Sequence, residues 1–548
     1  MEGKCRAGAL VAEVLKKHGA KYIFGIPGGH IYPAIERGEE LGIPFIGVRH
    51  EMTAAFAAEG WALTTGKFGV CTGTAGPGVT NLLTGLANSQ IGAFPVFALG
   101  GKARITENDR NELQDFNTMA ILSQMTKHSR QVLEPKRIPE YVGRAIAHCT
   151  TGKPGPVYIE VPRDLMESEI DLSTVQFQET YVTESKPQGD PASIQKAIEL
   201  IKEAQKPVII AGSGVWFAQA QDELKEFVEK TGIPFATRNA ARGCITDKHP
   251  LFISPGYDHP ILQALLAEAD LAIVIGTRPG FTLGRGNFRP GLKIVRIDID
   301  AAELNNQLEV TVGICGDAKE VLKQLIAGVE QRTLPQWTGY MAAVKQQFSG
   351  LFAAMLDPNH SPIHPVHLMS QIAARIDEDT VVVIDGGDTA TWATLVLPCY
   401  GPGQMLSIAA TSYGPLGVGM GYAIAAKLAH PEKKVIMITG DGAFGYGVAE
   451  FDTLKRYNLD ITTIILNDGL WGMIKRSEAK KASGKSKFVG VDLMPEVHYE
   501  KVVESYGGYG EFVTDPAEVG NAIDRALAAG KFSCVNVITD PQFGPPSR

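Results

Sequence analysis

The 548 residues, of which 44% are hydrophobic and 20% charged, predict an ordinary globular protein of about three domains. The net charge of −8 argues against a nucleic-acid or anionic-membrane partner, and no apolar run reaches the roughly 18 residues of a membrane span. The seven cysteines are scattered and lack CxxC spacing, which predicts free thiols and a cytoplasmic location.

Residues 1–170 alternate helical patterns with short apolar runs, which predicts an α/β domain with a parallel sheet covered by helices. The N-terminus reads as an amphipathic helix whose apolar face is formed by Leu10, Val11, Val14 and Leu15. The runs expected to form strands are 22–26, 45–48, 68–72, 95–99 and 157–161.

Several polar residues of this block follow predicted strands, where ligands of an open parallel sheet gather. His30 ends a Pro-Gly-Gly turn after the first strand, and Glu51 opens the helix after the second. A glycine–proline turn, 74–81, follows the third, and Gln114 lies in a polar segment beyond the fourth. A first-turn charge and a surface histidine are the simpler interpretations of Glu51 and His30 taken alone. We interpret His50 and His128 as structural.

Residues 171–190 are polar and aperiodic, which predicts a linker to a second α/β block over 191–330. Gly212-Ser-Gly214 is a weak sign of dinucleotide binding, because the third glycine of that fingerprint is missing. Polar turns at 276–278 and 298–300 also follow predicted strands, and simple caps and turns explain them equally well.

The third block, 366–548, contains the most informative stretch. A predicted strand over 435–439 ends in Gly440-Asp441-Gly442; after a helical pattern, a strand over 461–466 ends in Asn467-Asp468-Gly469. Asp441 and the asparagine about two dozen residues later offer hard oxygen ligands of the kind Mg²⁺ prefers. The glycines would let a diphosphate approach the backbone. The alternative is a βαβ unit with an ordinary Gly-Asp-Gly turn.

Three other segments of this block are candidates for ligand contact. The turn 385–389 is suited to binding a diphosphate through backbone N–H groups. A glycine-rich run, 412–421, holds Leu416 and leads into a helix. Residues 475–487 are rich in Lys, Ser and Ala, which predicts either a lid or a solvated basic helix.

Together these segments resemble the thiamine-diphosphate-dependent enzymes, and most closely the group of acetohydroxyacid synthase, benzaldehyde lyase and 2-hydroxyacyl-CoA lyase. The resemblance covers essentially the whole chain and implies a pyrimidine-binding domain (1–170), a middle domain (191–330) and a diphosphate- and Mg²⁺-binding domain (366–548). By this resemblance Asp441, Asn467 and the carbonyl of Gly469 bind Mg²⁺. The residues implied at the diphosphate end are Gly387, Asp388, Thr389, Gly440, Gly442 and Ala443.

The same resemblance places Glu51 against the aminopyrimidine ring nitrogen of the cofactor, a role for which we expect a desolvated carboxyl group. Leu416 would be the apolar wedge beneath the cofactor. Pro77 and Asn81 would line the pyrimidine, and His30 and Gln114 would face the substrate. Because Glu51 and the metal ligands lie on different domains, the resemblance implies a homodimer or a dimer of dimers with shared active sites.

The implied activity is that of a carbon–carbon lyase or carboligase acting on 2-hydroxy ketones, aldehydes or 2-hydroxyacyl-CoA thioesters. The alternative is an acetolactate-synthase-type enzyme that decarboxylates a 2-keto acid and ligates the acyl anion. Arg163 and Ala390 depart from the benzaldehyde lyase pattern; His30 and the segment 256–259 depart from that of acetohydroxyacid synthase. The middle domain would hold FAD, or the adenosine part of ADP or CoA. A non-catalytic nucleotide- or partner-binding paralogue and an NAD oxidoreductase are rivals of other classes.

Overall fold

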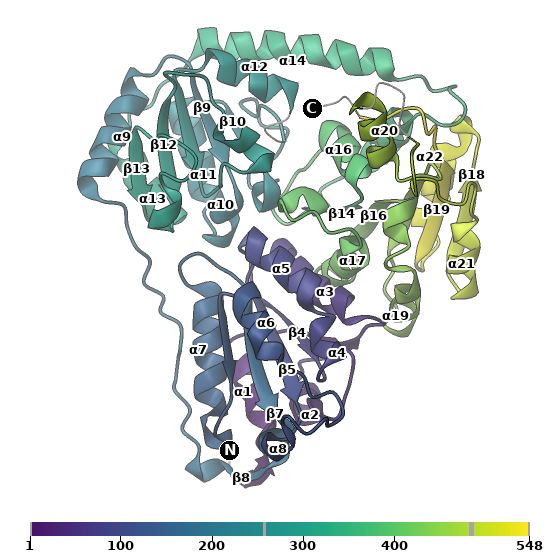
Figure 1. The fold of residues 1–548 in the computed structure, drawn as a ribbon. Helices are drawn as coiled ribbons and strands as arrows, with labels where there is room; N and C mark the ends of the chain where they lie inside the picture. Colours follow the sequence, from purple (N-terminus) through teal and green to yellow (C-terminus); the bar gives the residue numbers. More distant parts are fainter. Residues whose placement is uncertain (1–2, 256–258, 482–486, 546–548) are drawn as a thin grey trace. The chain divides into compact units, whose positions relative to one another are not determined.

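The computed structural model describes residues 3–255, 259–481 and 487–545 (Figure 1). Residues 256–258 of the departing segment and 482–486 of the predicted lid lie outside the described residues. The chain forms two compact units. The first comprises Met1–Ser185, Met420–Ala429 and Gly447–Asn458; the second comprises Lys186–Gly419, His430–Tyr446 and Leu459–Arg548.

Within the described residues, the first unit contains a six-stranded parallel sheet in the order β3-β2-β4-β5-β7-β6. Its strands are β2 (Ile23–Gly25), β3 (Phe45–Gly47), β4 (Gly69–Gly73), β5 (Val96–Lys102), β6 (His128–Gln131) and β7 (Val157–Pro162). Its helices are α1 (Ala9–Lys17), α2 (Tyr32–Glu40), α3 (Glu51–Thr65), α4 (Pro77–Thr80), α5 (Leu83–Gly92), α6 (Thr118–Met125), α7 (Ile138–Thr150) and α8 (Arg163–Glu167).

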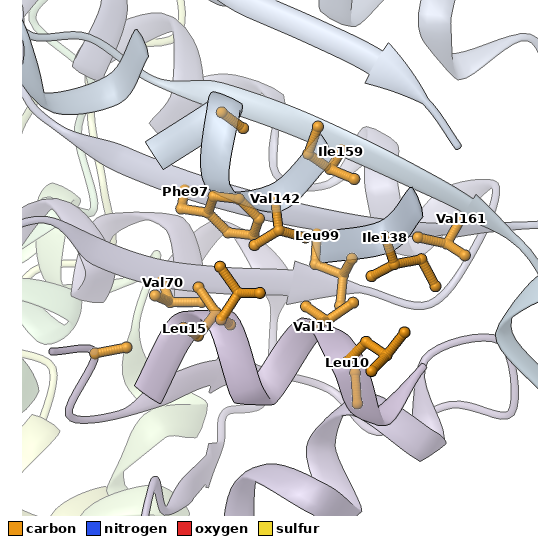
Figure 2. Packing of buried hydrophobic residues seen from close by; sticks show 14 of the residues in the cluster. Leu10, Val11, Leu15, Val70, Phe97, Leu99, Ile138, Val142, Ile159 and Val161 are labelled. Carbon is orange, nitrogen blue, oxygen red and sulfur yellow. The ribbon is translucent and has the colours of Figure 1, made fainter. Parts of the chain in front are cut away.

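The first helix buries the apolar face that its sequence predicts. Leu10, Val11, Val14 and Leu15 pack with residues of α7 and of strands β4, β5 and β7 (Figure 2). Each leucine buried in this way contributes about 1.5–3 kcal/mol. The prediction is wrong for the residues before this helix, because β1 (Lys4–Arg6) pairs antiparallel with β8 (Glu169–Asp171). Strand β6, with the sequence HSRQ, has no apolar run and was not predicted.

The middle domain, at the start of the second unit, is a parallel sheet in the order β10-β9-β11-β12-β13. Its strands are β9 (Pro207–Ala211), β10 (Phe235–Thr237), β11 (Leu271–Ile275), β12 (Lys293–Asp298) and β13 (Val312–Cys315). Its helices are α9 (Pro191–Glu203), α10 (Ser213–Phe217), α11 (Gln221–Thr231), α12 (Pro260–Glu268), α13 (Ala318–Gly328) and α14 (Pro335–Met355). A short 3₁₀ turn, Leu172–Thr174, interrupts the predicted linker, which otherwise has neither helix nor strand from 175 to 190.

The third sheet is parallel in the order β15-β14-β16-β17-β19-β18. Its strands are β14 (Thr380–Asp385), β15 (Met405–Ser407), β16 (Lys434–Gly440), β17 (Thr462–Asn467), β18 (Tyr509–Val513) and β19 (Ser533–Ile538). The helices of this part of the chain are α15 (Pro365–Ala373), α16 (Gly387–Val396), α17 (Val418–Ala429), α18 (Asp441–Phe444), α19 (Phe451–Arg456), α20 (Gly472–Lys481), α21 (Tyr499–Ser505) and α22 (Val519–Leu527). Three parallel sheets flanked by helices confirm the predicted α/β fold.

Strand order decides where ligands can bind at the first and the third sheet, which we call the outer sheets because they come first and last along the chain. In the first sheet β2 lies between β3 and β4, and in the third β14 lies between β15 and β16. The chain therefore leaves these neighbouring strands in opposite directions, which opens a crevice at their carboxyl ends. The turn after β2 contacts the turn after β4, since a Cβ on Gly28 would lie 2.2 Å from Thr74 Oγ1. The turn after β14 likewise contacts the turn after β16.

Two expectations from composition can be compared with the structure. All seven cysteines are free thiols, as predicted. No helix among the described residues combines the length and apolar character needed to cross a membrane.

Candidate functional site

Asp441 lies at the carboxyl end of β16 and is held by two backbone N–H groups. Its Oδ1 accepts from Gly442 N and its Oδ2 from Gly469 N, each at 3.0 Å. The ends of β16 and β17 therefore meet, as the sequence predicts. Burial and the neighbouring Asp468 carboxylate raise the pKa of Asp441 to about 7. A divalent cation at this position would stabilise the ionised carboxylate.

Asn467 presents an unsatisfied oxygen at the same edge. Its Nδ2 donates to Asn536 Oδ1 at 3.1 Å and to the Val497 carbonyl at 3.2 Å, which fixes the orientation of the amide. Its Oδ1 is buried and has no hydrogen-bond partner in the described structure. A buried amide oxygen in this state has the chemistry of a missing cation ligand. Asn536, which the sequence did not single out, is itself fixed by donating to Glu500 Oε2 at 2.9 Å.

Two glycines of the motif occupy positions where a side chain would not fit. Gly469 has a φ of +66°, and its carbonyl accepts from Leu493 N at 2.8 Å, which leaves one lone pair for a metal ion. A Cβ added to Gly442 would lie 2.6 Å from the ring of Trp471. The residues present thus fit Mg²⁺ next to a tightly packed backbone turn.

The turn after β14 lies against the turn after β16. Gly386 has a φ of +98°, and a Cβ on it would lie 3.2 Å from Gly440 N. Helix α16 begins at the next residue, Gly387, so its first N–H groups open onto this edge. Thr389 is buried in the first turn of the helix, and Asp388 pairs with Arg476.

Asp385 begins the predicted diphosphate turn 385–389, but the sequence analysis gave its side chain no role. Its buried carboxyl group accepts hydrogen bonds from Gly386 N at 2.8 Å, Gly417 N at 3.1 Å and Gly419 N at 2.9 Å. Burial raises the pKa of Asp385 to about 6 although these three donors oppose the rise. The carboxylate joins the predicted diphosphate turn to the backbone just after Leu416. Leu416 itself is partly exposed, as a residue that contacts a ligand must be.

In the first unit, Glu51 is the first residue of α3 and only 6% exposed, so the expected desolvation is observed. Its Oε2 accepts from Asn81 Nδ2 at 3.0 Å. A Cβ on Gly78, in the turn that Pro77 opens, would lie 3.2 Å from Glu51 Oε1. His50 caps the helix, with its Nδ1 accepting from Met52 N at 3.1 Å, as expected of a structural residue.

Glu450 is a second residue that the sequence analysis missed, and it holds the segment in front of Glu51. Its buried carboxylate accepts from Arg49 N at 3.0 Å and His50 N at 3.2 Å. Thr453 Oγ1 donates to the same group at 2.7 Å. A glutamate within an otherwise apolar helical pattern was the available signal for this residue.

His30 lies at the crevice between β2 and β4. Its Nδ1 is 3.2 Å from Thr74 Oγ1, and a Cβ on Gly101 would lie 2.4 Å from its own Cβ. Burial, with a smaller contribution from Arg163, lowers the pKa of His30, so the imidazole is neutral at neutral pH. Gln114 has a φ of +62°, and its backbone packs against Gly76 in the turn after β4. The fold therefore brings His30, Gln114 and this turn together.

The polar turns of the middle domain also gather at one edge, because β9, β11 and β12 are neighbours. The backbones of Gly214 and Gly276 are so close that a Cβ on Gly214 would lie 2.7 Å from Gly276 Cα. Arg238, after β10, is buried and its Nη1 donates to Thr277 Oγ1 at 3.4 Å. The sequence analysis did not identify this arginine, since β10 is too short to show a pattern.

Comparison with known proteins identifies the family. The thiamine pyrophosphate enzyme N-terminal binding domain matches residues 5–121, the central domain 194–325 and the C-terminal binding domain 385–537. A Mycobacterium bovis protein named probable acetolactate synthase is 33% identical over 99% of this chain and 97% of its own length. The chain belongs to the thiamine pyrophosphate enzyme family. The predicted family is thereby confirmed.

This thiamine pyrophosphate enzyme, whose cofactor is also called thiamine diphosphate, has relatives with several activities. Oxalyl-CoA decarboxylase of Escherichia coli is 28% identical over 98% of this chain and 95% of its own length. Human 2-hydroxyacyl-CoA lyase 1 is 27% identical over 99% of this chain and 96% of its own length. The group to which the sequence was assigned is confirmed, whereas the reaction and the roles of individual residues stay predictions.

Proposed function

We propose that this enzyme is a thiamine-diphosphate-dependent carbon–carbon lyase or carboligase acting on 2-hydroxy ketones, aldehydes or 2-hydroxyacyl-CoA thioesters. The observation that carries the proposal is the neutral, buried His30 imidazole at the crevice beside the turn that contacts Glu51. When bound, the cofactor supplies a nucleophilic carbon and an electron sink for the carbanion that carbon–carbon cleavage leaves.

The metal and diphosphate end of the site belongs to the third sheet. Asp441, Asn467 Oδ1 and the Gly469 carbonyl would hold Mg²⁺, because their oxygens converge at one edge and that of Asn467 has no other partner. The backbone of the two glycine turns after β14 and β16 would bind the diphosphate. Gly387, Asp388, Thr389, Gly440, Gly442 and Ala443 form these turns.

Glu51 would hold the pyrimidine end of the cofactor. Its desolvated carboxyl group can share a proton with a ring nitrogen, and Asn81 fixes the orientation of this group. Leu416 would support the cofactor from below, on the backbone that Asp385 anchors. Glu51 would thus bind the pyrimidine end of the ligand, and Leu416 would determine its shape.

His30 would move the substrate proton. Thr74 engages its Nδ1, so Nε2 is the nitrogen available to a substrate. A neutral imidazole can take the proton of a 2-hydroxyl group during cleavage and return it during ligation. Gln114, which packs against the adjoining turn, would bind the carbonyl oxygen of the substrate.

Acetolactate formation from a 2-keto acid is the second candidate. It is favoured by the 33% identity to the Mycobacterium bovis protein, against 27% for the human lyase. Decarboxylation, the first half-reaction, starts from a keto acid and so needs no base for a 2-hydroxyl proton. His30 would then be dispensable for the first half-reaction.

A product screen separates the two candidates. The enzyme, supplied with thiamine diphosphate and Mg²⁺, is offered pyruvate, benzaldehyde, formaldehyde or formyl-CoA in separate reactions. Acyloin as the sole product supports the lyase, and acetolactate from pyruvate supports the second candidate. His30→Ala should lower cleavage about 100-fold or more while cofactor affinity is retained. His128→Ala, a half-buried histidine stacked on His148, is the matched control.

We also propose that the middle domain binds the adenosine diphosphate part of a nucleotide such as FAD, ADP or CoA. The close glycine backbones and the buried Arg238 guanidinium at the carboxyl edge support this. ADP should raise the melting temperature of the wild-type enzyme, and Arg238→Gln should abolish the shift. Flavin absorbance in purified enzyme would identify FAD as the occupant.

We infer in addition that the active enzyme is a homodimer or a dimer of dimers with shared sites. Glu51→Gln and Asp441→Asn variants, each inactive alone, should recover up to about one quarter of wild-type activity after mixing and reassembly. Hybrid dimers then contain one site with both native residues. Reassembled hybrids without any recovery would show that both residues act within one chain.

A further inference from the structure

Arg476, on helix α20, lies among three segments of the second unit that are distant in sequence. Its Nη2 pairs with Asp388 in the first turn of α16 and lies 3.5 Å from Asp468 Oδ2 after β17. Its Nη1 donates to the Pro541 carbonyl, beyond β19, at 2.7 Å. The three side chains are each about one fifth exposed.

The backbone is shaped to admit this arginine. A Cβ on Gly472, one helical turn earlier on α20, would lie 2.1 Å from Arg476 Nη2. A Cβ on Gly544, beyond β19, would lie 2.6 Å from its Cδ. The guanidinium therefore lies back along its own helix between two glycines, in a position set by packing.

The two carboxylates that pair with Arg476 lie at the edge where we propose that the negatively charged diphosphate binds. Asp388 belongs to the turn that we assign to the diphosphate, and Asp468 stands between two of the proposed Mg²⁺ ligands. Neither carboxylate is among those ligands, so the metal ion does not neutralise them directly. A cofactor diphosphate adds further negative charge at the same edge, and like charges at short range repel in a partly buried site.

We propose that Arg476 is a positioning residue for the cofactor, one that neutralises Asp388 and Asp468 so that this edge accepts a diphosphate. Its contact with Pro541 also ties helix α20 to the segment that follows β19. The inference rests on the proposed placement of the diphosphate. It adds a cation that neither the metal motif nor the glycine turns contain.

Cofactor binding, measured by titrating thiamine diphosphate in the presence of Mg²⁺ and following tryptophan fluorescence or heat, tests the proposal without turnover. Arg476→Gln should raise the Kd about tenfold or more, as expected for loss of a charge-assisted pair. The substitution Asp388→Asn removes one of the repelling charges, so the double variant Asp388→Asn, Arg476→Gln should recover most of that affinity. At saturating cofactor, kcat of the single variant should stay within about threefold of wild type.

Lys475→Gln is the matched control, because this neighbouring cation on α20 pairs with the exposed Asp492 at 2.9 Å. It should leave the Kd unchanged. Arg476→Lys keeps the charge and helps if the glutamine variant folds poorly; it should bind with intermediate affinity, since lysine lacks the fork that reaches several partners. An unchanged Kd in Arg476→Gln, or no recovery in the double variant, overturns the inference. Wild-type enzyme that binds no thiamine diphosphate would instead overturn the proposed function.

Discussion

The two outer sheets have the same topology and different chemistry. When only the strands of each sheet are counted in chain order, both sheets run second, first, third, fourth, sixth and fifth, and all neighbours are parallel. Both crevices therefore open beside the first strand. The first sheet places a buried carboxyl group and a neutral imidazole there, Glu51 and His30. The third gathers Asp385, Asp388, Asp441, Asn467, Asp468 and Arg476.

Under the proposed function, strand order determines where the ligand lies, and the turn residues determine which part of it binds. In the first sheet the buried Glu51 carboxyl group accepts a hydrogen bond from the side-chain amide of Asn81. The third sheet holds Asp385 through three backbone N–H groups, which suits a structural anchor. Under the proposed function, an acidic residue serves chemistry in the first sheet and geometry in the third.

Glu51→Gln should have the largest effect, because it removes the proton-sharing group of the first sheet while the metal site of the third remains intact. We expect kcat to fall by about 10³-fold, with the Kd for thiamine diphosphate changed much less. Steady-state kinetics and a binding titration measure the two quantities. Glu59→Gln, on the same helix α3, is the control for a buried glutamate. A rate close to wild type in Glu51→Gln would favour a non-catalytic role for this site.

Removal of the metal should weaken cofactor binding at the third sheet and leave the residues of the first sheet unaffected. Chelation with EDTA, or Asn467→Leu, should weaken thiamine diphosphate binding by about 100-fold, because the oxygen ligands then no longer share a cation with the diphosphate. The stabilisation of the wild-type protein by cofactor, about 2.7 kcal/mol at 100 times Kd, should disappear in thermal unfolding. Excess Mg²⁺ should reverse the effect of EDTA and leave that of the substitution. Cofactor binding that is independent of Mg²⁺ would contradict the assignment.

Asp385→Asn tests whether the Asp385 side chain contributes only by fixing the backbone after Leu416. An amide has one oxygen for the donors of Gly417 and Gly419, so the backbone after Leu416 should lose its fixed position. We expect kcat to fall about 10- to 100-fold, and the Kd for cofactor to rise by less. Kinetics at saturating cofactor measure the first effect. A variant that loses only cofactor affinity would place Asp385 with the diphosphate ligands.

The smallest effect concerns Glu59, a carboxyl group within helix α3 of the first unit. Glu59 is fully buried and accepts from Ser89 Oγ at 2.8 Å, from Asn88 and from Tyr422. Burial raises the pKa of Glu59 to about 8 from its ordinary value of 4.5. Between these values only the folded state holds the proton, so the free energy of unfolding should fall as the pH rises from 4.5 to 8.

Glu59→Gln should remove this dependence on pH, which amounts to at most a few kcal/mol in the free energy of unfolding between pH 4.5 and 8. Urea unfolding at several pH values measures it, and Asn88→Ala checks that loss of a hydrogen bond alone leaves the slope in place. An equal slope in the wild type and the glutamine variant would show that Glu59 does not titrate in this range.

Local sequence was sufficient to predict the motif and the elements around it. The strand ends at Asp441 and Asn467, the helix that starts at Glu51 and the apolar face of α1 depend on residues a few positions apart. Such neighbours impose their period and turn chemistry wherever the chain goes. The polar strand β6 was missed because its stability comes from pairing with β7 and not from its own side chains.

The sequence by itself determined the family, the α/β class and the residue types offered to cofactor and metal, because each is encoded in short runs with their own spacing. Only the tertiary structure decided that Asn536 orients Asn467, that Asp385 holds the backbone after Leu416, and that Arg476 meets Asp388. These contacts join segments from 32 to 88 residues apart. They follow from strand order and packing, which no local pattern specifies.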